Sequence, residues 1–358
     1  MRHRVISYPL FVSIIFVAIL LLSGCSQDTE NESGRILFRW SRHKANLPYD
    51  ELVMMDGDGG NPQVLGKFSG APSWSPSGKW IAVGCPSEDE TAREICILDV
   101  STIPSTLSFP YTERRGKTEI TSRIALPDRC IEIEQSQRDD WPYYGIISLS
   151  WSPDETRLAV ICGTSGVQNI YLEQQLQTCV ISLKGKTDCW DTDLGTSIIR
   201  AVWSPKDDLL VVSNEPGFKA KVYIVNPDGS NPRHIADGWS PEWSPDGEQI
   251  AFFRYEVMES TDQPLNGGIA VVDRNGTNMQ WLFLPESARS EDIVFIDECG
   301  DECRLTWSPD GKYLAFVVSQ YQQGTFRLHR LDVNSGEIKL LLDYSLFGRW
   351  AMVPDWEP

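Results

Sequence analysis

Histidine is scarce in this chain, and the local signatures of several enzyme classes are missing. Only four of the 358 residues are histidine. The chain has no Gly-x-Ser-x-Gly, no His-Glu-x-x-His and no glycine-rich phosphate loop, the motifs of serine hydrolases, zinc proteases and P-loop enzymes. His43, His234 and His329 lie at unrelated places in the repeats described below. We therefore expect a protein that is not an enzyme and that needs no metal or cofactor.

Basic residues are also in short supply. The chain has 32 lysines and arginines against 50 aspartates and glutamates, and its formal net charge is −18. Such a surface repels nucleic acid and anionic lipid. We expect no nucleic-acid partner, and the acidity by itself favours solubility rather than any particular cationic partner.

The N-terminus has the parts of a secretory signal. Met1 to Arg4 carries two arginines, residues 5–22 carry no charge, and Leu22-Ser23-Gly24-Cys25 follows. This ending resembles the lipobox of bacterial lipoproteins, in which the cysteine receives the lipid and becomes the first residue of the mature protein. An uncleaved membrane anchor is the alternative, because 18 apolar residues are just enough to span a bilayer.

The resemblance divides the chain into three parts. Residues 1–24 are expected to be a lipoprotein signal peptide, and residues 25–33 the lipidated Cys25 with a polar, flexible tether. Residues 34–358 would form the folded domain. A lipid at Cys25 implies an extracytoplasmic, membrane-anchored protein of the cell envelope, because several acyl chains hold a membrane firmly. The sequence does not fix which membrane holds the lipid.

One segment recurs five times. Each copy starts with Trp-Ser-Pro, continues into a turn and ends in an apolar run, which indicates two antiparallel strands joined by a tight turn. The copies begin at Trp74, Trp151, Trp203, Trp243 and Trp307. In most copies a third apolar strand, a second tight turn and a short fourth strand follow, as in residues 328–342. Four antiparallel strands in each repeat make the blade of a β-propeller.

The repeats resemble those of the TolB-type propeller family, with its Trp-Ser-Pro-Asp-Gly signature, over nearly all of residues 34–358. The resemblance implies an all-β fold with six blades. Residues 34–40 match a second strand rather than a first, and residues 353–358 match the start of a repeat. We therefore expect the C-terminal segment to join the first blade and close the ring. A seventh, degenerate blade within 105–146 is the alternative.

The long connections are expected at one face of the ring. Tight turns join the first to the second strand and the third to the fourth, so they share one face. Segments such as 86–93, 111–146 and 285–304 belong to the other connections and should gather on the opposite face, where binding loops usually lie. Trp141, Tyr143 and Tyr144 in the longest segment are candidate binding residues, with packing onto the ring as the alternative.

The cysteines indicate disulfides. Eight remain besides Cys25, an even number in an exported chain. Cys85 and Cys162 occupy matching repeat positions, and so do Cys96 and Cys179, which predicts the pairs Cys85–Cys96 and Cys162–Cys179. For the others we expect Cys130–Cys189 and Cys299–Cys303, all in connectors on the loop-rich face. A zinc site built from these last four cysteines is the less favoured alternative.

Two acidic segments deserve a second interpretation. Residues 56–59 resemble the start of a calcium loop but lack the later glutamate, so we expect an ordinary turn. Acidic residues also cluster within 291–302, where a solvated loop is expected and a calcium site is the alternative.

The sequence therefore predicts a membrane-anchored, non-enzymatic propeller that binds an envelope protein or acts as a scaffold. A glycan-binding or glycan-cleaving propeller is the alternative, because some lyases resemble this architecture. The identity of the partner is not readable from the sequence.

Overall fold

The computed structural model describes most of residues 34–358 and none of residues 1–33. The described residues are 34–42, 50–85, 94–103, 129–132, 145–163, 176–190, 194, 198–214, 219–258, 263–284, 304–320, 325–343 and 349–358. Residues 33–358 form one compact unit. Its described elements are 23 strands and one short 3₁₀ helix at Val100–Thr102, so the fold is all-β as predicted.

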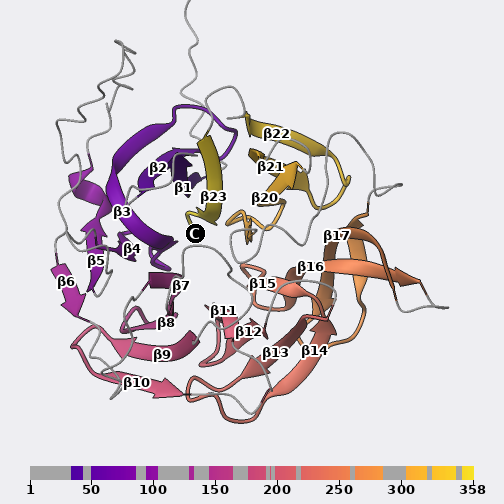
Figure 1. The fold of residues 1–358 in the computed structure, drawn as a ribbon, viewed down its shortest axis with the longest axis horizontal. Coiled ribbons are helices and arrows are strands. Elements are labelled where there is room, and N and C mark those ends of the chain that lie inside the picture. The colour runs from indigo at the N-terminus through magenta and orange to yellow at the C-terminus, as the bar shows by residue number, and fades with distance from the viewer. Residues whose placement is uncertain are drawn as a thin grey trace, which may run out of the picture. The chain divides into compact units, whose positions relative to one another are not determined.

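The strands form six blades of four antiparallel strands each (Figure 1). Blade 1 contains β23 (Arg349–Trp356), β1 (Arg35–Arg42), β2 (Asp50–Asp56) and the first half of β3 (Gln63–Trp74). Blade 2 contains the second half of β3, β4 (Trp80–Gly84), β5 (Glu94–Asp99) and β6 (Arg129–Glu132). Blade 3 contains β7 (Gly145–Trp151), β8 (Arg157–Gly163), β9 (Leu176–Ser182) and β10 (Thr187–Trp190).

The other three blades repeat this meander without shared strands. Blade 4 contains β11 (Ile198–Trp203), β12 (Leu210–Asn214), β13 (Lys221–Val225) and β14 (Arg233–Asp237). Blade 5 contains β15 (Trp239–Trp243), β16 (Gln249–Met258), β17 (Gln263–Asp273) and β18 (Gln280–Phe283). Blade 6 contains β19 (Leu305–Trp307), β20 (Tyr313–Gln320), β21 (Thr325–Asp332) and β22 (Ile338–Asp343).

The C-terminal strand closes the ring, as the sequence predicts. β23 pairs with β1, with Leu37 opposite Asp355 and Ile36 opposite Trp356. The innermost strands also contact one another in the ring order β3, β7, β11, β15, β19, β23 and back to β3 (Figure 1). Blade 1 is therefore built from both ends of the propeller sequence, and β1 is paired on both sides rather than left as an open sheet edge.

The repeat motif forms its turn through one serine and one aspartate. In the copy that starts at Trp307, the Ser308 hydroxyl donates to the Asp310 carboxylate at 2.7 Å and accepts from the Tyr313 backbone N–H at 2.9 Å. Gly311 takes a positive φ of 69°, which suits glycine at the turn tip. The same serine–aspartate bond recurs at Ser152–Asp154 and Ser244–Asp246, both at 2.6 Å. The motif is thus a turn device that holds the two inner strands together.

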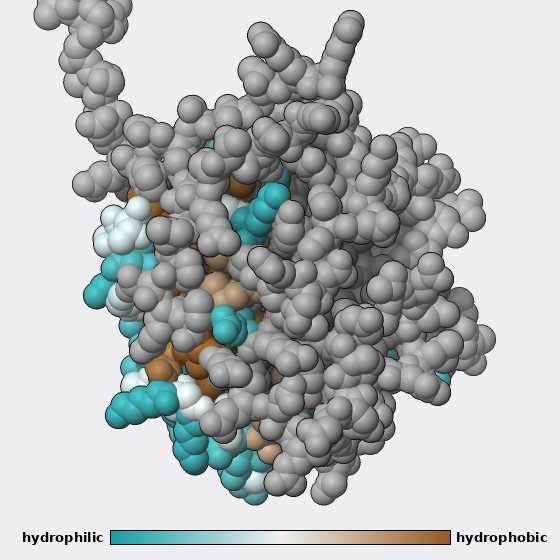
Figure 2. Space-filling model, turned by 60° about the vertical axis from the view of Figure 1, so that its left-hand side comes forward, coloured by the Kyte–Doolittle hydropathy of each residue, from teal (hydrophilic) through white to brown (hydrophobic). Residues whose placement is uncertain are grey.

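The hydrophobic core lies between neighbouring blades. On the face shown in Figure 2, the coloured hydrophobic residues lie among hydrophilic ones. The second strand of each blade is buried on both faces, as in β12, where all five residues are buried. Side chains from one blade pack on the next: Ala82 and Ile97 of blade 2 share a cluster with Trp151 and Leu158 of blade 3. The packing of blades on one another therefore provides the core of the domain.

The described strands form six blades and no seventh, and the longest insertion is divided by β6. β6 lies within the region 105–146 and is the fourth strand of blade 2. Residues 104–128, which lie outside the described residues, therefore connect a third strand to a fourth, a connection that we expected to be a tight turn in nearly every blade. The prediction that all of 111–146 joins the loop-rich face is wrong for this part, because β6 carries a weak strand signal of only four residues.

Among the described residues, no helix is both long and apolar enough to cross a membrane.

Candidate functional site

The residue before each repeat tryptophan lies at the junction between two blades. Ser150 Oγ accepts the backbone N–H of Trp203 at 3.0 Å, and Thr306 Oγ1 accepts that of Trp356 at 3.1 Å. In each case the donor belongs to the innermost strand of the next blade. A side-chain acceptor at this position therefore connects neighbouring blades close to the ring axis.

The repeat tryptophans contribute a second type of junction bond. Trp151 Nε1 donates to the carbonyl of Ser73 at 3.1 Å, and Trp243 Nε1 donates to that of Val202 at 3.3 Å. Both tryptophans are about 4% exposed. These two tryptophans therefore pack and form hydrogen bonds between blades.

Acidic residues replace the hydroxyl at this junction position in two blades. Asp355 of β23 accepts the backbone N–H of Trp74 at 2.5 Å, so it connects blade 1 to blade 2. Glu242 of β15 takes the same position in blade 5 and forms an ion pair with Arg200 of β11 at 2.5 Å. The two side chains of this pair are 8% and 14% exposed. These carboxylates bring negative charge into the centre of the ring.

A second arginine crosses the ring. Arg304, directly before β19 in blade 6, donates through Nη2 to the carbonyl of Ile147 in β7. Blade 3 lies opposite blade 6 in a six-bladed ring, so this side chain spans the axis. Arg304 is 2% exposed and interacts electrostatically with Glu242 and with Asp355. We call Arg200, Glu242, Arg304 and Asp355 the axial cluster.

The pKa of Asp355 is raised to about 7. Burial is the main cause, and the nearby Glu242 carboxylate raises it further. The bond from the Trp74 N–H and the charges of Arg200 and Arg304 act in the opposite direction. Asp355 is therefore close to its titration point at neutral pH, which is unusual for an aspartate.

The pKa of Glu242 is also raised, again because burial disfavours the charged form. Arg200 lowers it through charge and hydrogen bonding, and Arg304 lowers it through charge. Burial outweighs both, so Glu242 and Asp355 hold their protons more tightly than exposed carboxyls do.

The axial cluster can hold the ring together and can exchange protons, and its groups already have partners within the chain. Arg200 pairs with Glu242, Asp355 accepts from Trp74, and Arg304 donates across the axis. Ser148 Oγ and Arg200 Nε nevertheless have no hydrogen-bond partner although both are buried. These contacts of charged side chains involve all six blades: blade 1 with 2, blade 4 with 5 and blade 6 with 3.

Sequence reasoning did not single out the axial cluster. A signal was present: when the five repeats and the C-terminal strand are aligned, most residues one position before the tryptophan are small or hydroxyl-bearing, and Glu242 and Asp355 are the charged exceptions. Arg200 and Arg304 lie three positions before their tryptophans, where Ser148 and Ser240 stand in other copies. Charged residues within an otherwise buried strand indicate paired charges.

The predicted binding and lipidation residues lie elsewhere in the chain. Trp141, Tyr143 and Tyr144, the lipidation candidate Cys25, and the acidic segment 291–302 are outside the described residues. So is His43, whereas His234 is exposed in blade 4 and His329 is buried in blade 6. No group of three metal-ligating side chains occurs in the described part of the chain.

The turn at residues 56–61 is held by its own side chains. Asn61 Nδ2 donates to Asp56 Oδ2 at 2.7 Å, and Gly60 N–H donates to Asp58 Oδ1 at 2.8 Å. Asn278 and Asp273 form the matching bond in blade 5 at 2.7 Å. The interpretation as an ordinary turn, rather than a calcium loop, therefore fits this geometry.

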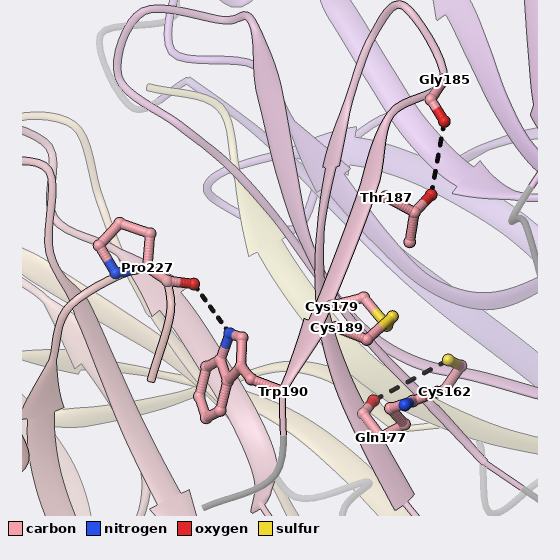
Figure 3. Close-up of a disulfide and its surroundings, with 8 residues drawn as sticks. All are labelled: Cys162, Gln177, Cys179, Gly185, Thr187, Cys189, Trp190 and Pro227. Carbon is pink, nitrogen blue, oxygen red and sulfur yellow. Dashed lines mark hydrogen bonds between the residues drawn. A yellow bond between two sulfur atoms is a disulfide. The ribbon is translucent and has the colours of Figure 1, made fainter. Parts of the chain in front are cut away.

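The disulfides agree with the predictions in blade 2 and differ in blade 3. Cys85–Cys96 forms as expected. The predicted pair Cys162–Cys179 is wrong, because Cys179 bonds to Cys189 and Cys162 is a buried free thiol (Figure 3). The prediction placed Cys189 in a connector, whereas Cys189 lies on β10 directly opposite Cys179 and so offers a second partner to it.

The remaining cysteine predictions change with this result. Cys189 is not available for Cys130, so the pair Cys130–Cys189 is wrong. Both residues lie in fourth strands, β6 and β10, rather than in connectors, because those short strands were not recognised in the sequence. Cys299 and Cys303 are outside the described residues.

Comparison with known proteins places the fold. TolB of Acinetobacter baumannii is similar over 95% of this chain and 70% of its own, with a TM-score of 0.59 and 16% identity. A putative TolB of Agrobacterium tumefaciens is similar over 91% of this chain and 99% of its own, with a TM-score of 0.52 and 15% identity. The chain has the TolB-type propeller fold.

Two other proteins are similar to this TolB-like propeller. An oligogalacturonate lyase in complex with manganese gives a TM-score of 0.50 at 12% identity, over 82% of this chain and 71% of its own. An uncharacterized protein of Agrobacterium fabrum is 23% identical over 276 residues, covering 69% of this chain and 83% of its own length. No protein-family model matches the sequence. At these identities the similarities concern the fold alone.

Proposed function

We propose that this chain is a lipid-anchored protein of the bacterial cell envelope whose propeller binds another envelope protein and catalyses no reaction. The segment that ends in Cys25 supports the anchor, and the disulfides support an oxidising location outside the cytoplasm. The TolB-type fold supports a binding propeller by analogy.

One observation carries the non-enzymatic interpretation: the charged groups at the ring axis serve the ring. Arg200 and Glu242 pair with each other, and Arg304 donates to a backbone carbonyl of the opposite blade. Asp355 accepts the backbone N–H of Trp74 in the next blade. An active site needs groups aimed at a substrate, whereas these are aimed at the scaffold. The partner surface would then be a face of the ring.

The entry point of the chain indicates which face that is. Gly34 lies before β1, and its carbonyl accepts the N–H of Gly57 in the turn after β2. A Cβ on Gly34 would be 3.2 Å from Trp356 Nε1, at the end of β23. The propeller therefore begins at the face of the tight turns, and a tether before Gly34 would enter there. The opposite face, which carries connectors such as 133–144, would point away from the membrane and receive the partner.

The experiment is a crosslinked pull-down from envelope extract with the soluble protein, residues 26–358. One variant replaces 133–144, which contains Trp141, Tyr143 and Tyr144, with a Gly-Ser segment of equal length. The matched control replaces 106–126, which leaves β6 intact and joins strands at the other face. We expect enrichment of one specific protein by the wild type and the control, and its loss in the 133–144 variant. Loss in the control alone, or no specific enrichment, would contradict the proposal.

A glycan-binding or glycan-cleaving function is the second candidate. It is favoured by the fold similarity to an oligogalacturonate lyase. Retention of the protein on cell-wall or polysaccharide material, without enrichment of a protein, would favour it. Release of soluble saccharides from that material would add cleavage.

A further inference from the structure

Blade 3 carries a row of three cysteines, one on each of its three outer strands. Cys179 on β9 lies directly opposite Cys189 on β10, and the two form the disulfide. On the other side, Cys179 lies opposite Val160 of β8, two residues from Cys162. Cys162 is thus the diagonal neighbour of Cys179 and keeps its thiol.

Blade 2 has the same row in the same register but bonds it differently. Cys85 corresponds to Cys162, because each lies at the matching place after the second strand of its repeat. Cys96 corresponds to Cys179: it lies opposite Val83 of β4 and opposite Cys130 of β6. Here the diagonal pair forms the disulfide, Cys85–Cys96, with a Cα–Cα distance of 5.2 Å.

The two blades therefore show that both neighbours of the middle cysteine can be bonded to it. A Cα–Cα distance of 5.2 Å is in the ordinary range for a disulfide. Sheet twist shortens one diagonal between adjacent strands, which brings such pairs within reach. The strand register that places Cys85 diagonal to Cys96 in blade 2 also places Cys162 diagonal to Cys179 in blade 3.

The three sulfur-bearing residues of blade 3 also share one environment. Cys162 and Cys179 are buried in the same apolar cluster between blades 2 and 3, and Cys189 packs against it. Cys162 projects toward the Cys179–Cys189 bridge, with its thiol donating to the Gln177 carbonyl at 3.9 Å (Figure 3). A free thiol beside a disulfide is the arrangement in which exchange takes place.

We propose that blade 3 undergoes internal thiol–disulfide exchange, in which Cys162 displaces Cys189 from Cys179 and the bridge moves from the outer strand pair to the inner one. The Cys162 thiolate attacks Sγ of Cys179, the Cys162–Cys179 bond forms and the Cys179–Cys189 bond breaks. Cys189 leaves as a thiolate and takes up the proton that Cys162 has lost. Electrons balance within the chain, and no external oxidant is needed.

The environment of Cys162 makes the exchange slow at rest. Burial raises the pKa of its thiol to about 11, so very little thiolate is present at neutral pH. Exchange should accelerate with rising pH and with a small thiol that opens the bridge transiently.

The exchange changes how the outermost strand is held. In the described structure β10 is covalently tied to β9, and Trp190 Nε1 donates to the carbonyl of Pro227 in blade 4 at 2.8 Å (Figure 3). Transfer of the bridge to β8–β9 removes the covalent tie and leaves β10 with its backbone bonds and the Trp190 contact. The position of the disulfide among the three cysteines thus determines whether β10 is covalently attached to blade 3.

The test is disulfide mapping of the folded protein. Wild-type protein is incubated at about pH 8 with a mixture of reduced and oxidised glutathione. Free thiols are then trapped by alkylation in denaturing acid, and the linked peptides are identified by mass spectrometry. We expect Cys162–Cys179 peptides with alkylated Cys189 to accumulate, while Cys85–Cys96 peptides persist as the internal reference. In Cys162→Ser, Cys179 should be found linked to Cys189 and to no other cysteine.

A second variant tests the geometry independently. In Cys189→Ser we expect Cys162 and Cys179 to bond to each other, in a protein with wild-type circular dichroism and cooperative unfolding. A folded Cys189→Ser protein with both thiols free would overturn the proposal. So would wild-type protein that yields no Cys162–Cys179 peptide after incubation, and this result stands even if Cys189→Ser does not fold.

Discussion

Two repeat tryptophans that look identical in the sequence differ in their hydrogen bonding. Trp151 Nε1 donates to the Ser73 carbonyl, whereas Trp203 Nε1 is buried without a hydrogen-bond partner. The guanidinium of Arg157 stacks over the Trp203 ring, 4.7 Å from its centroid. Trp203 therefore interacts through a ring face rather than through its N–H. The same motif residue therefore contributes in two ways.

This difference predicts unequal effects of removing the indole N–H. Trp151→Phe leaves the buried Ser73 carbonyl without its donor, which costs about 1–2 kcal/mol beyond the loss of ring area. Trp203→Phe removes a donor that has no partner. We expect Trp151→Phe to lower the free energy of unfolding more than Trp203→Phe by about that amount, measured by urea denaturation. Equal losses would contradict the assignment.

Asp355 predicts a pH dependence of stability. Its pKa is raised from 3.8 to about 7 in the folded protein, so the folded state binds the proton more tightly than the unfolded state. The stabilisation is complete below the unfolded pKa and is lost as pH rises through about 7. We expect the free energy of unfolding to fall by roughly 1–3 kcal/mol from about pH 5 to about pH 8.

Asp355→Asn should flatten this profile. The amide oxygen still accepts the Trp74 N–H, but the group no longer titrates. The remaining slope would come from Glu242, whose pKa is also raised. An unchanged slope in Asp355→Asn, from denaturation curves at several pH values, would show that another group is responsible.

The sequence predicts residues that interact with near neighbours in the chain, and it does not predict those that interact across the ring. The serine, aspartate and glycine of the repeat turn are readable because they interact within about five positions of one another. The axial cluster joins Asp355 to Trp74 and Arg304 to Ile147, and these pairs become neighbours only when the ring closes. Cys179 bonds to a cysteine of β10, and β10 has only four residues, which is too short a pattern to predict a strand from the sequence.

Among the elements, β10 contacts the next blade through the side chain of Trp190. The Trp190 ring lies against the turn at Gly229, where an added Cβ would be 2.4 Å from the ring. Gly229 also takes a positive φ of 78°, which disfavours a side chain. The close approach of this turn therefore depends on glycine.

Gly229→Ala should weaken the attachment of β10. We expect a loss of about 2–3 kcal/mol in unfolding free energy, from the backbone conformation and from the clash with Trp190. Gly185→Ala is the matched control, because Gly185 has a φ of 96° and nothing within 4 Å of the added Cβ. It should lose only about 1 kcal/mol. If the two variants lose equal amounts by thermal or urea denaturation, the Trp190 contact is not important for stability.

The strands with continuous apolar runs were predicted well, and the short outer strands were not. The second strands β4, β8, β12, β16 and β20 are buried on both sides, so their apolar runs are continuous. β6 and β10 have only four residues each, of mixed polarity, which is a weak strand pattern. The error in placing residues 104–128 follows directly from overlooking β6.

For the whole molecule, ring closure depends on the last ten residues. β23 pairs with β1, Asp355 joins it to blade 2, and Thr306 accepts the Trp356 N–H from blade 6. Removal of residues 349–358 would expose the edge of β1 and remove the Asp355 carboxyl from the axial cluster. We expect the truncated protein to lose its cooperative unfolding transition and to become sensitive to proteolysis.

Glu357→Gln is the control for this truncation. It breaks only the partly exposed ion pair with Arg35, which is worth less than about 1 kcal/mol. Its unfolding transition should stay cooperative. A truncated protein that unfolds as cooperatively as Glu357→Gln would mean that blade 1 is stable without its innermost strand.

The sharing of blade 1 between the two ends of the domain has a consequence in time. A ribosome makes β1 near the beginning and β23 at the end, so β1 waits through the synthesis of five further blades with its inner edge unpaired. During that interval the growing chain has an open strand with which other chains can pair. Protection of this edge until β23 is made is then as much a requirement for the protein as any contact in the finished ring.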